Sequence, residues 1–164
     1  DYNRKQADGP VAREAVDLVE LVENVVAAHS LPARAKLMHT ELALRARHCL
    51  AEPALLISVM DNLYSNAVHY GAESGNIRIH SYRHGEQVRI DVANSGEPIP
   101  AAEKNMIFEP FYQGSHQRKG AVKGSGLGLS IARDCVRQMQ GELSLVDAPA
   151  GQVCFRITLP SAPE

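Results

Sequence analysis

The chain has 164 residues and a mass of 17.8 kDa, with 45% hydrophobic and 22% charged residues, a balance that predicts one globular domain and argues against disorder. Its formal net charge of −2 gives no support for a nucleic-acid partner or an anionic lipid surface. No apolar run approaches the roughly 20 residues of a membrane span, so we expect no membrane contact, and three cysteines without a Cys-x-x-Cys pair are typical of buried thiols in a reducing compartment.

The chain begins with a polar segment that lacks an initial methionine. We interpret residues 1–15 as a tail, or as the end of a preceding linker in a larger protein, and we expect the domain itself to span residues 16–160. We therefore expect the chain to be a piece of a longer protein.

The first expected helix follows a capping box, in which Asp17 is followed three residues later by Glu20. Its apolar residues recur at helical spacing on one face: Leu18, Leu21, Val22, Val25 and Val26. We expect this helix to end near residues 29–32, at a proline-containing loop. Partial alternation over residues 36–47 then predicts a strand.

A second helix is expected from Pro53, because proline suits the first helical turn. Its buried stripe is Leu56, Val59, Met60, Leu63 and Ala67. Asn62, Asn66 and Tyr70 follow one another at four-residue steps on a neighbouring stripe. Two amides on that stripe are not explained by core packing alone.

Two alternating segments, 77–83 and 87–93, are joined by His-Gly-Glu and predict an antiparallel hairpin. A turn-rich loop follows over residues 94–100, and a short helix is expected over residues 103–108.

Residues 113–124 are polar and basic without periodicity, and a third long helix is expected over residues 126–140, ended by Gly141. Segments 142–146 and 151–159 predict a last hairpin. Hairpins with helices, and no βαβ units, predict an α/β fold: a two-layer α/β sandwich in which a mixed, mostly antiparallel five-stranded sheet packs on three helices.

Three glycines at alternate positions, Gly124, Gly126 and Gly128, run directly into the third helix. A glycine-rich turn that leads into a helix N-terminus presents free N–H groups and favours phosphate. The alternative is a flexible linker. The spacing matches neither the Rossmann fingerprint nor the P-loop.

Four stretches together resemble the conserved boxes of sensor histidine kinases, in the same order and spacing. Residues 62–70, Asn-Leu-Tyr-Ser-Asn-Ala-Val-His-Tyr, resemble the asparagine box, and residues 94–100 resemble the first glycine box. Residues 107–112, Ile-Phe-Glu-Pro-Phe-Tyr, resemble the phenylalanine box, and residues 124–130, Gly-Ser-Gly-Leu-Gly-Leu-Ser, the second glycine box. The resemblance implies the Bergerat (GHKL) ATP-binding fold, which type II topoisomerases and Hsp90 chaperones share.

The side-chain amides of Asn62 and Asn66 are suited to ATP and Mg²⁺ as cofactors. Mg²⁺ takes hard oxygen ligands and keeps several waters, and the Asn66 amide oxygen meets that need without adding charge beside a triphosphate. Asn62, one turn earlier, is placed to hydrogen-bond a metal-bound water or a phosphate oxygen. Because asparagine cannot act as a base, we expect slow ATP hydrolysis. The alternative for both side chains is simple surface solvation.

The same resemblance implies further nucleotide contacts. His69 is expected near the phosphates, with a solvated surface histidine as the alternative, and Tyr70 against the ribose or adenine, with ordinary core packing as the alternative. Asn94 stands where the family has an adenine-reading aspartate, so its bond to adenine loses charge assistance. Pro98 replaces a glycine.

Gly96 and Ile99 keep the first glycine box recognisable, although Asn94 and Pro98 are expected to weaken nucleotide affinity. Residues 113–124 correspond to the ATP lid, whose cations Arg118, Lys119 and Lys123 suit the phosphates; the alternative is a solvated loop. Gln113 replaces an arginine of the family. The remaining expected nucleotide-binding residues are Tyr112, Gly124, Ser125, Gly126, Leu127, Gly128 and Leu129.

The resemblance implies the catalytic fragment of a protein-histidine kinase. Its γ-phosphoryl group would go to a histidine on a separate dimerisation domain of the same protein, and then to an aspartate of a response regulator. The full-length protein would be a homodimer, and this fragment the cytoplasmic part of a membrane-anchored sensor. His29 lacks the acidic neighbour of a phosphoacceptor and is expected in a loop. The alternatives are a degenerate, regulatory kinase domain with weak nucleotide affinity and, disfavoured by Asn62, a gyrase- or Hsp90-type ATPase.

Overall fold

The computed structural model describes residues 11–110, 112 and 128–163. Its main sheet has five strands in the order β2-β4-β5-β7-β6. The strands are β2 (His39–Leu44), β4 (Asn76–His84), β5 (Gln87–Ser95), β6 (Glu142–Val146) and β7 (Gln152–Pro160). β2 is parallel to β4, whereas the other neighbouring pairs are antiparallel. The predicted mixed, mostly antiparallel sheet is therefore confirmed.

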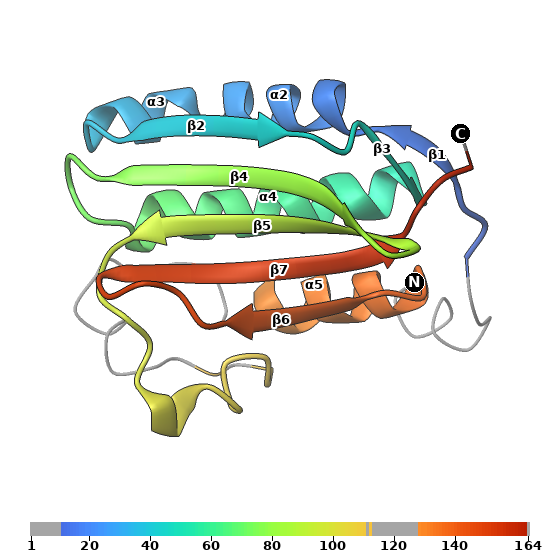
Figure 1. Cartoon of the computed structure of the whole chain (residues 1–164). Coiled ribbons are helices and arrows are strands. Elements are labelled where there is room, and N and C mark those ends of the chain that lie inside the picture. Colours follow the sequence, from blue (N-terminus) through green and yellow to red (C-terminus); the bar gives the residue numbers. More distant parts are fainter. Residues whose placement is uncertain (1–10, 111, 113–127, 164) are drawn as a thin grey trace.

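Three longer helices, α2 (Leu18–Ala28), α4 (Pro53–Tyr70) and α5 (Gly128–Gln138), lie on one face of this sheet (Figure 1). The result is the predicted two-layer α/β sandwich. The core fills the space between the layers, where fully buried Leu56, Met60 and Leu63 of α4 belong to the same cluster as Ile79 and Ile90 of the sheet.

The starts of α2 and α4 show why these helices begin where they do. Asp17 Oδ1 accepts a hydrogen bond from the Glu20 N–H at 3.1 Å, which caps α2 as the sequence predicted. Ahead of α4, the Glu52 carboxylate accepts from the N–H groups of Ala54 and Leu55 at 3.3 and 3.1 Å. Pro53 occupies the first helical turn, where its missing N–H costs no hydrogen bond.

The structure corrects four expectations about local structure. The strand expected over 36–47 is confined to β2, and residues 29–32 do not form the expected loop, because α3 (Ser30–Ala35) occupies most of that segment. Pro32 lies in the first turn of α3, where proline is tolerated. The helix expected over 103–108 is instead a 3-10 turn, Ala101–Glu103, followed by further turns.

The third long helix ends at Gln138, two residues before its expected end. Gln140 has a φ of +65°, a left-handed conformation that stops an α-helix. A two-stranded sheet, β1 (Glu14–Asp17) with β3 (His48–Ala51), was not expected from the sequence. Its strands are too short for alternation to reveal them.

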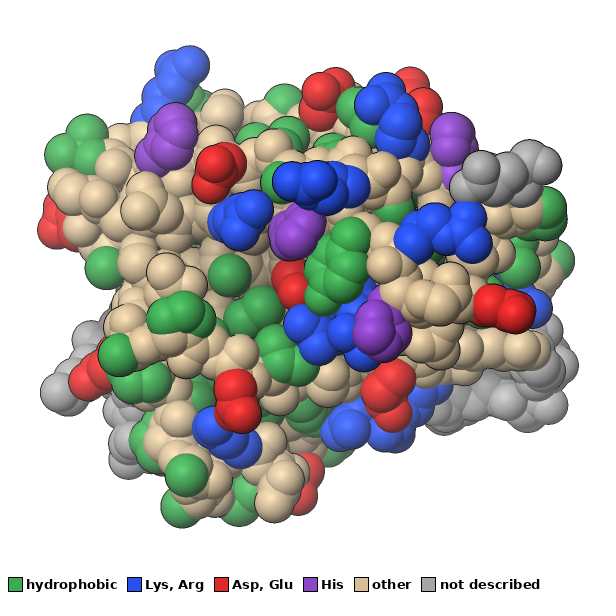
Figure 2. Space-filling model, viewed as in Figure 1, with side chains coloured by type: hydrophobic (Ala, Val, Ile, Leu, Met, Phe, Trp, Pro, Cys, Tyr) green, Lys and Arg blue, Asp and Glu red, His purple; other side chains and the backbone are tan. Residues whose placement is uncertain are grey.

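The face of the main sheet opposite the helices is polar, as Figure 2 shows by the basic and histidine side chains spread over it. His80, Asp91 and Arg156 are neighbours across β4, β5 and β7. Arg156 donates to both Asp91 carboxylate oxygens, at 2.8 and 3.1 Å. This face therefore needs no cover from a further apolar layer.

The cysteines Cys49, Cys135 and Cys154 are buried and form no disulfide, which agrees with the predicted buried thiols. Burial raises the pKa of the Cys49 thiol to about 12, so this group stays protonated and unreactive at neutral pH. Among the described residues, none of the helices combines the length and hydropathy needed to span a membrane.

Candidate functional site

A cleft opens between α4, the end of β5 with the loop after it, the start of α5, and β7. Helix α4 contributes Leu63, Asn66, Ala67 and Tyr70 to its lining. The other lining residues are Val92, Asn94, Glu97, Ile99, Ile107, Leu129, Val153 and Phe155. Five predicted site residues therefore share one cleft: Asn66, Tyr70, Asn94, Ile99 and Leu129.

Most of this lining is apolar, with two amides and one carboxylate among it. That composition is typical of a site that holds a flat, apolar ring and orients it by a few polar contacts. The space left between the side chains is about 30 Å³, room for only one or a few water molecules, of which each needs about 10–15 Å³. A larger ligand must therefore displace part of the lining.

The second glycine box and the asparagine box meet at Gly128 and Asn62. A Cβ added to Gly128 would lie 2.6 Å from Asn62 Nδ2 and 3.0 Å from its Oδ1, which is too close for a side chain. With glycine at position 128, the start of α5 approaches the amide of Asn62 closely, and a larger residue there would push that amide aside. Asn66, one turn further along α4, is only half-buried, so its amide is not sealed in the interior.

Asn94 lines the cleft at the end of β5, and Gly96 follows it in the next loop. Asn94 is 8% exposed, and its Nδ2 donates to the Ser95 carbonyl at 3.0 Å. A Cβ on Gly96 would lie 3.1 Å from the Tyr70 carbonyl oxygen and 3.2 Å from Asn94 Nδ2. Glycine at this position lets the loop after β5 lie against the end of α4. The Asn94 Oδ1 atom can accept a hydrogen bond from a ligand in the cleft.

His69 and Tyr70 pack against each other at the end of α4. Their ring centroids are 4.3 Å apart in an edge-on arrangement, and His69 Nε2 is buried. His69 is thus more enclosed than a solvated surface histidine. Burial raises the pKa of the Tyr70 hydroxyl, which keeps it neutral and able to donate.

Lys36 holds this end of α4 and was missed by the sequence reasoning. Its Nζ donates to the carbonyl oxygens of Val68, His69 and Gly71 at 2.8, 2.9 and 2.6 Å. A cation at a helix C-terminus satisfies carbonyls that lack an intrahelical partner. Burial lowers the pKa of Lys36, against an opposing influence of Glu73. No local pattern reveals this contact, because Lys36 is 32 residues from Val68.

The remaining predicted site residues divide into two groups. Tyr112 does not line the cleft; its hydroxyl donates to the Glu103 carboxylate. Outside the described residues lie Gln113, Arg118, Lys119, Lys123, Gly124, Ser125, Gly126 and Leu127. Conversely, Phe155 and Val153 of β7 and Ile107 line the cleft without having been predicted, since only the fold brings them to α4.

The donor set fits a magnesium ion that is bound mainly through a ligand. The described residues contain no cluster of three or more histidine, cysteine, aspartate or glutamate side chains that would hold a metal by themselves. Asn66 lines the cleft and can offer one amide oxygen. Mg²⁺ is often held by one or two protein oxygens together with waters and phosphates, which agrees with this arrangement.

Comparison with known proteins places these observations in a family. A model of histidine kinase-, DNA gyrase B- and HSP90-like ATPases matches residues 51–163. The chain is 72% identical to the sensor histidine kinase GlrK of Escherichia coli K12 over 162 residues, which cover 99% of this chain and 34% of GlrK. It is 37% identical to the sensor protein KdpD of the same organism over 125 residues, 70% of this chain and 14% of KdpD.

The fold also matches solved structures. The catalytic domain of the histidine kinase ThkA, in a nucleotide-free form, gives a TM-score of 0.81 at 28% identity, over 93% of this chain and 98% of that one. ThkA in complex with the response regulator TrrA gives a TM-score of 0.76 at 27% identity, over 92% of this chain and 42% of that one. The chain spans about one third of the length of GlrK. From the family match and these identities, this chain belongs to the histidine kinase-, DNA gyrase B- and HSP90-like ATPases.

Proposed function

We propose that this chain is the ATP-binding catalytic domain of a two-component sensor histidine kinase. The observation that carries the proposal is the meeting of Gly128 with Asn62, one helical turn from the cleft-lining Asn66. Relatives at 72 and 71% identity are named sensor histidine kinases, which supports this reading over the other branches of the family.

The residues have distinct roles in this proposal. Adenine enters between Tyr70 and Ile99, and its exocyclic amine donates to Asn94 Oδ1, since Asn94 Nδ2 already donates to Ser95. Because only about 30 Å³ is free, the ring displaces side chains of the loop after β5. Neutral Asn94 gives a weaker bond than an aspartate would.

At the other end, Asn66 would hold Mg²⁺ through its amide oxygen, and the ion would neutralise charge on the β- and γ-phosphates. Asn62 would donate to a phosphate oxygen or would orient a water that the ion holds. Neither asparagine can take a proton from water, so attack by water is not promoted. The γ-phosphoryl group passes instead to a histidine ring nitrogen, and ADP leaves.

The partners follow from the same proposal. The phosphoacceptor is a histidine on a helical dimerisation domain of the same longer protein, which acts as a homodimer, and the next acceptor is a response regulator. ThkA, a structural neighbour, was solved in complex with the response regulator TrrA. We infer a cytoplasmic location for this domain, because ATP and a response regulator are found there.

A second candidate is a degenerate domain that binds nucleotide poorly and acts through protein contacts. The neutral Asn94, which lines the cleft, favours it. The two candidates differ in whether the chain transfers phosphate.

The test supplies the chain with radiolabelled ATP, Mg²⁺ and a purified helical hairpin that contains the candidate histidine of the longer protein. We expect labelled, acid-labile phosphate on the hairpin, slow release of free phosphate, and no labelling of a hairpin with that histidine replaced. Absence of transfer together with undetectable ATP binding would favour the regulatory module. Rapid release of phosphate by the chain alone would indicate a gyrase- or Hsp90-type ATPase.

A further inference from the structure

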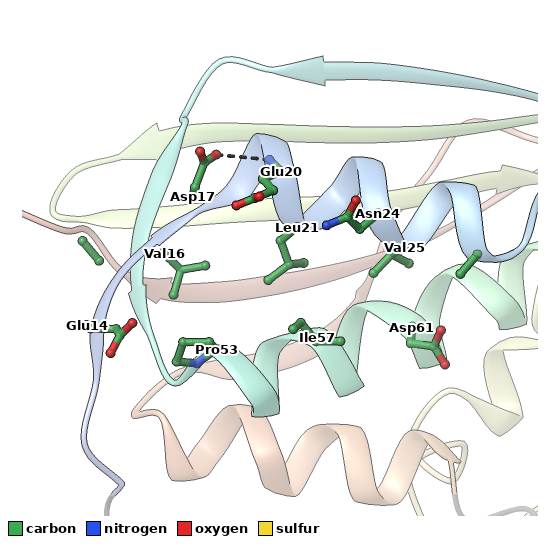
Figure 3. A pocket seen from close by; sticks show the side chains of 12 residues that line it. Glu14, Val16, Asp17, Glu20, Leu21, Asn24, Val25, Pro53, Ile57 and Asp61 are labelled. Atoms are coloured by element: carbon green, nitrogen blue, oxygen red, sulfur yellow. Dashed lines mark hydrogen bonds between the residues drawn. The ribbon is translucent and has the colours of Figure 1, made fainter.

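A second hollow, separate from the nucleotide cleft, lies between α2, α4 and β1 (Figure 3). Its volume is about 380 Å³, and it shares no lining residue with the cleft. Leu21 and Val25 of α2 face Ile57 of α4 across it. Ile57 is 48% exposed, so a large apolar side chain in the second turn of α4 is left without full cover.

The lining residues recur every four positions on both helices. On α2 they include Leu21 and Val25, and on α4 they are Pro53, Ile57 and Asp61. Eight residues of helix extend for about 12 Å, so the hollow is a groove that follows the helix axes for about two turns. A ridge of side chains spaced three and four residues apart on another helix fits such a groove.

The rim of the groove is acidic. Glu14, Asp17, Glu20 and Asp61 line it, whereas no lysine or arginine does so among the described residues. Asp17 caps α2, and Asp61 accepts from His29 Nε2 at 2.6 Å. This one-sided charge is complementary to lysine or arginine side chains beside the apolar face of a bound helix.

We propose that this groove binds an amphipathic helix of a partner protein, with apolar side chains in the groove and basic side chains on its rim. The site lies on a different stretch of α4 from the cleft, because residues 53, 57 and 61 line the groove whereas 63, 66, 67 and 70 line the cleft. Binding there goes beyond nucleotide binding and does not depend on it.

The test uses a fluorescein-labelled peptide of about four helical turns, with leucines at three- and four-residue spacing flanked by lysines, and a matched peptide with glutamate for lysine. Binding to the full chain is measured by fluorescence anisotropy. We expect the basic peptide to bind at micromolar concentration, more weakly as salt rises, and the acidic peptide not to bind. Equal binding of both peptides, or no binding, would overturn the proposal.

Matched variants locate the site. Ile57→Ser and Glu20→Lys are each expected to weaken binding by about tenfold or more. The controls Leu31→Ser, at a side chain that is 73% exposed, and Glu23→Lys, at an exposed position of α2, lie outside the groove and should bind as the unchanged chain does.

Circular dichroism melting confirms that each variant folds, and unchanged ATP affinity of Ile57→Ser separates this result from any failure at the cleft. Unaltered peptide binding by folded Ile57→Ser would refute the assignment. A dimer in sedimentation that Ile57→Ser abolishes would show that a second copy of the chain occupies the groove, which would also contradict the proposal.

Discussion

Replacing Lys36 with methionine tests whether a distant cation holds the end of α4 that carries Tyr70. The change keeps most of the apolar stem but removes three hydrogen bonds, of 2.8, 2.9 and 2.6 Å, to the carbonyls of Val68, His69 and Gly71. A hydrogen bond to a charged group contributes about 1.5–3 kcal/mol, and a cation at a helix C-terminus about 0.3–1 kcal/mol. Burial of the ammonium, which lowers its pKa, offsets part of this gain.

We therefore expect Lys36→Met to lower the free energy of unfolding by about 2 kcal/mol, measured by urea denaturation followed by circular dichroism. ATP affinity should fall as well, because Tyr70 and Gly71 lose their support. The control is Lys104→Met: Lys104 Nζ lies 3.7 Å from Asp147 Oδ1 at the exposed surface, and its loss should cost less than about 0.5 kcal/mol. Equal stability of the two variants would refute this account of Lys36.

Two further predictions concern contacts that residues of α5 make, Gly128 with Asn62 and Arg137 with Glu142 of β6. In Gly128→Ala, the added Cβ would lie 2.6 Å from Asn62 Nδ2 and push the Asn62 amide out of place. We expect ATP affinity to fall by about tenfold, while the midpoint of urea unfolding changes little. Undiminished ATP affinity would contradict the proposed contact. Burial raises the pKa of Glu142, but hydrogen bonds, chiefly from Arg137, outweigh it and lower the pKa below 4.5. Its stabilising contribution is present above pH 4.5 and lost as pH falls through the lower folded-state pKa. Glu142→Gln should therefore lose less stability than the unchanged chain as the pH falls below 4.5, and parallel losses would count against the Arg137 contact.

Helix caps, apolar periodicity and turn residues were enough to predict two of the helices and the β4–β5 hairpin. The Asp17 cap, Pro53 and the apolar stripes on the helices predicted α2 and α4, because capping and periodicity depend on residues a few positions apart. The alternation on both sides of the His-Gly-Glu turn predicted the β4–β5 hairpin for the same reason.

Other features depend on contacts between distant parts of the chain, and the sequence did not reveal them. Strands β1 and β3 pair across more than 30 residues, and each is too short to show alternation. Lys36 reaches the end of α4 only in the folded chain. From the sequence alone, Pro32 predicts the end of helical structure, although it lies in the first turn of α3.

In the candidate site, too, the sequence predicted the residues that belong to local motifs and not those that only the fold brings there. The asparagine box and the two glycine boxes predicted five residues that the fold brings to one cleft: Asn66, Tyr70, Asn94, Ile99 and Leu129. The β7 side of the cleft carries no motif, because an apolar side chain on a strand has the same pattern whether it lines a cleft or fills the core.

The central claim is that the Asn66 amide oxygen holds the magnesium of bound ATP. Titration calorimetry of ATP into the full chain, with Mg²⁺ and with EDTA, tests it directly when repeated on Asn66→Ala and on Asn24→Ala, an exposed asparagine of α2 outside the cleft. We predict that Mg²⁺ strengthens ATP binding by about tenfold or more in the unchanged chain and in Asn24→Ala, and that Asn66→Ala binds ATP equally weakly with and without the metal. Full magnesium-dependent strengthening in Asn66→Ala would contradict the account.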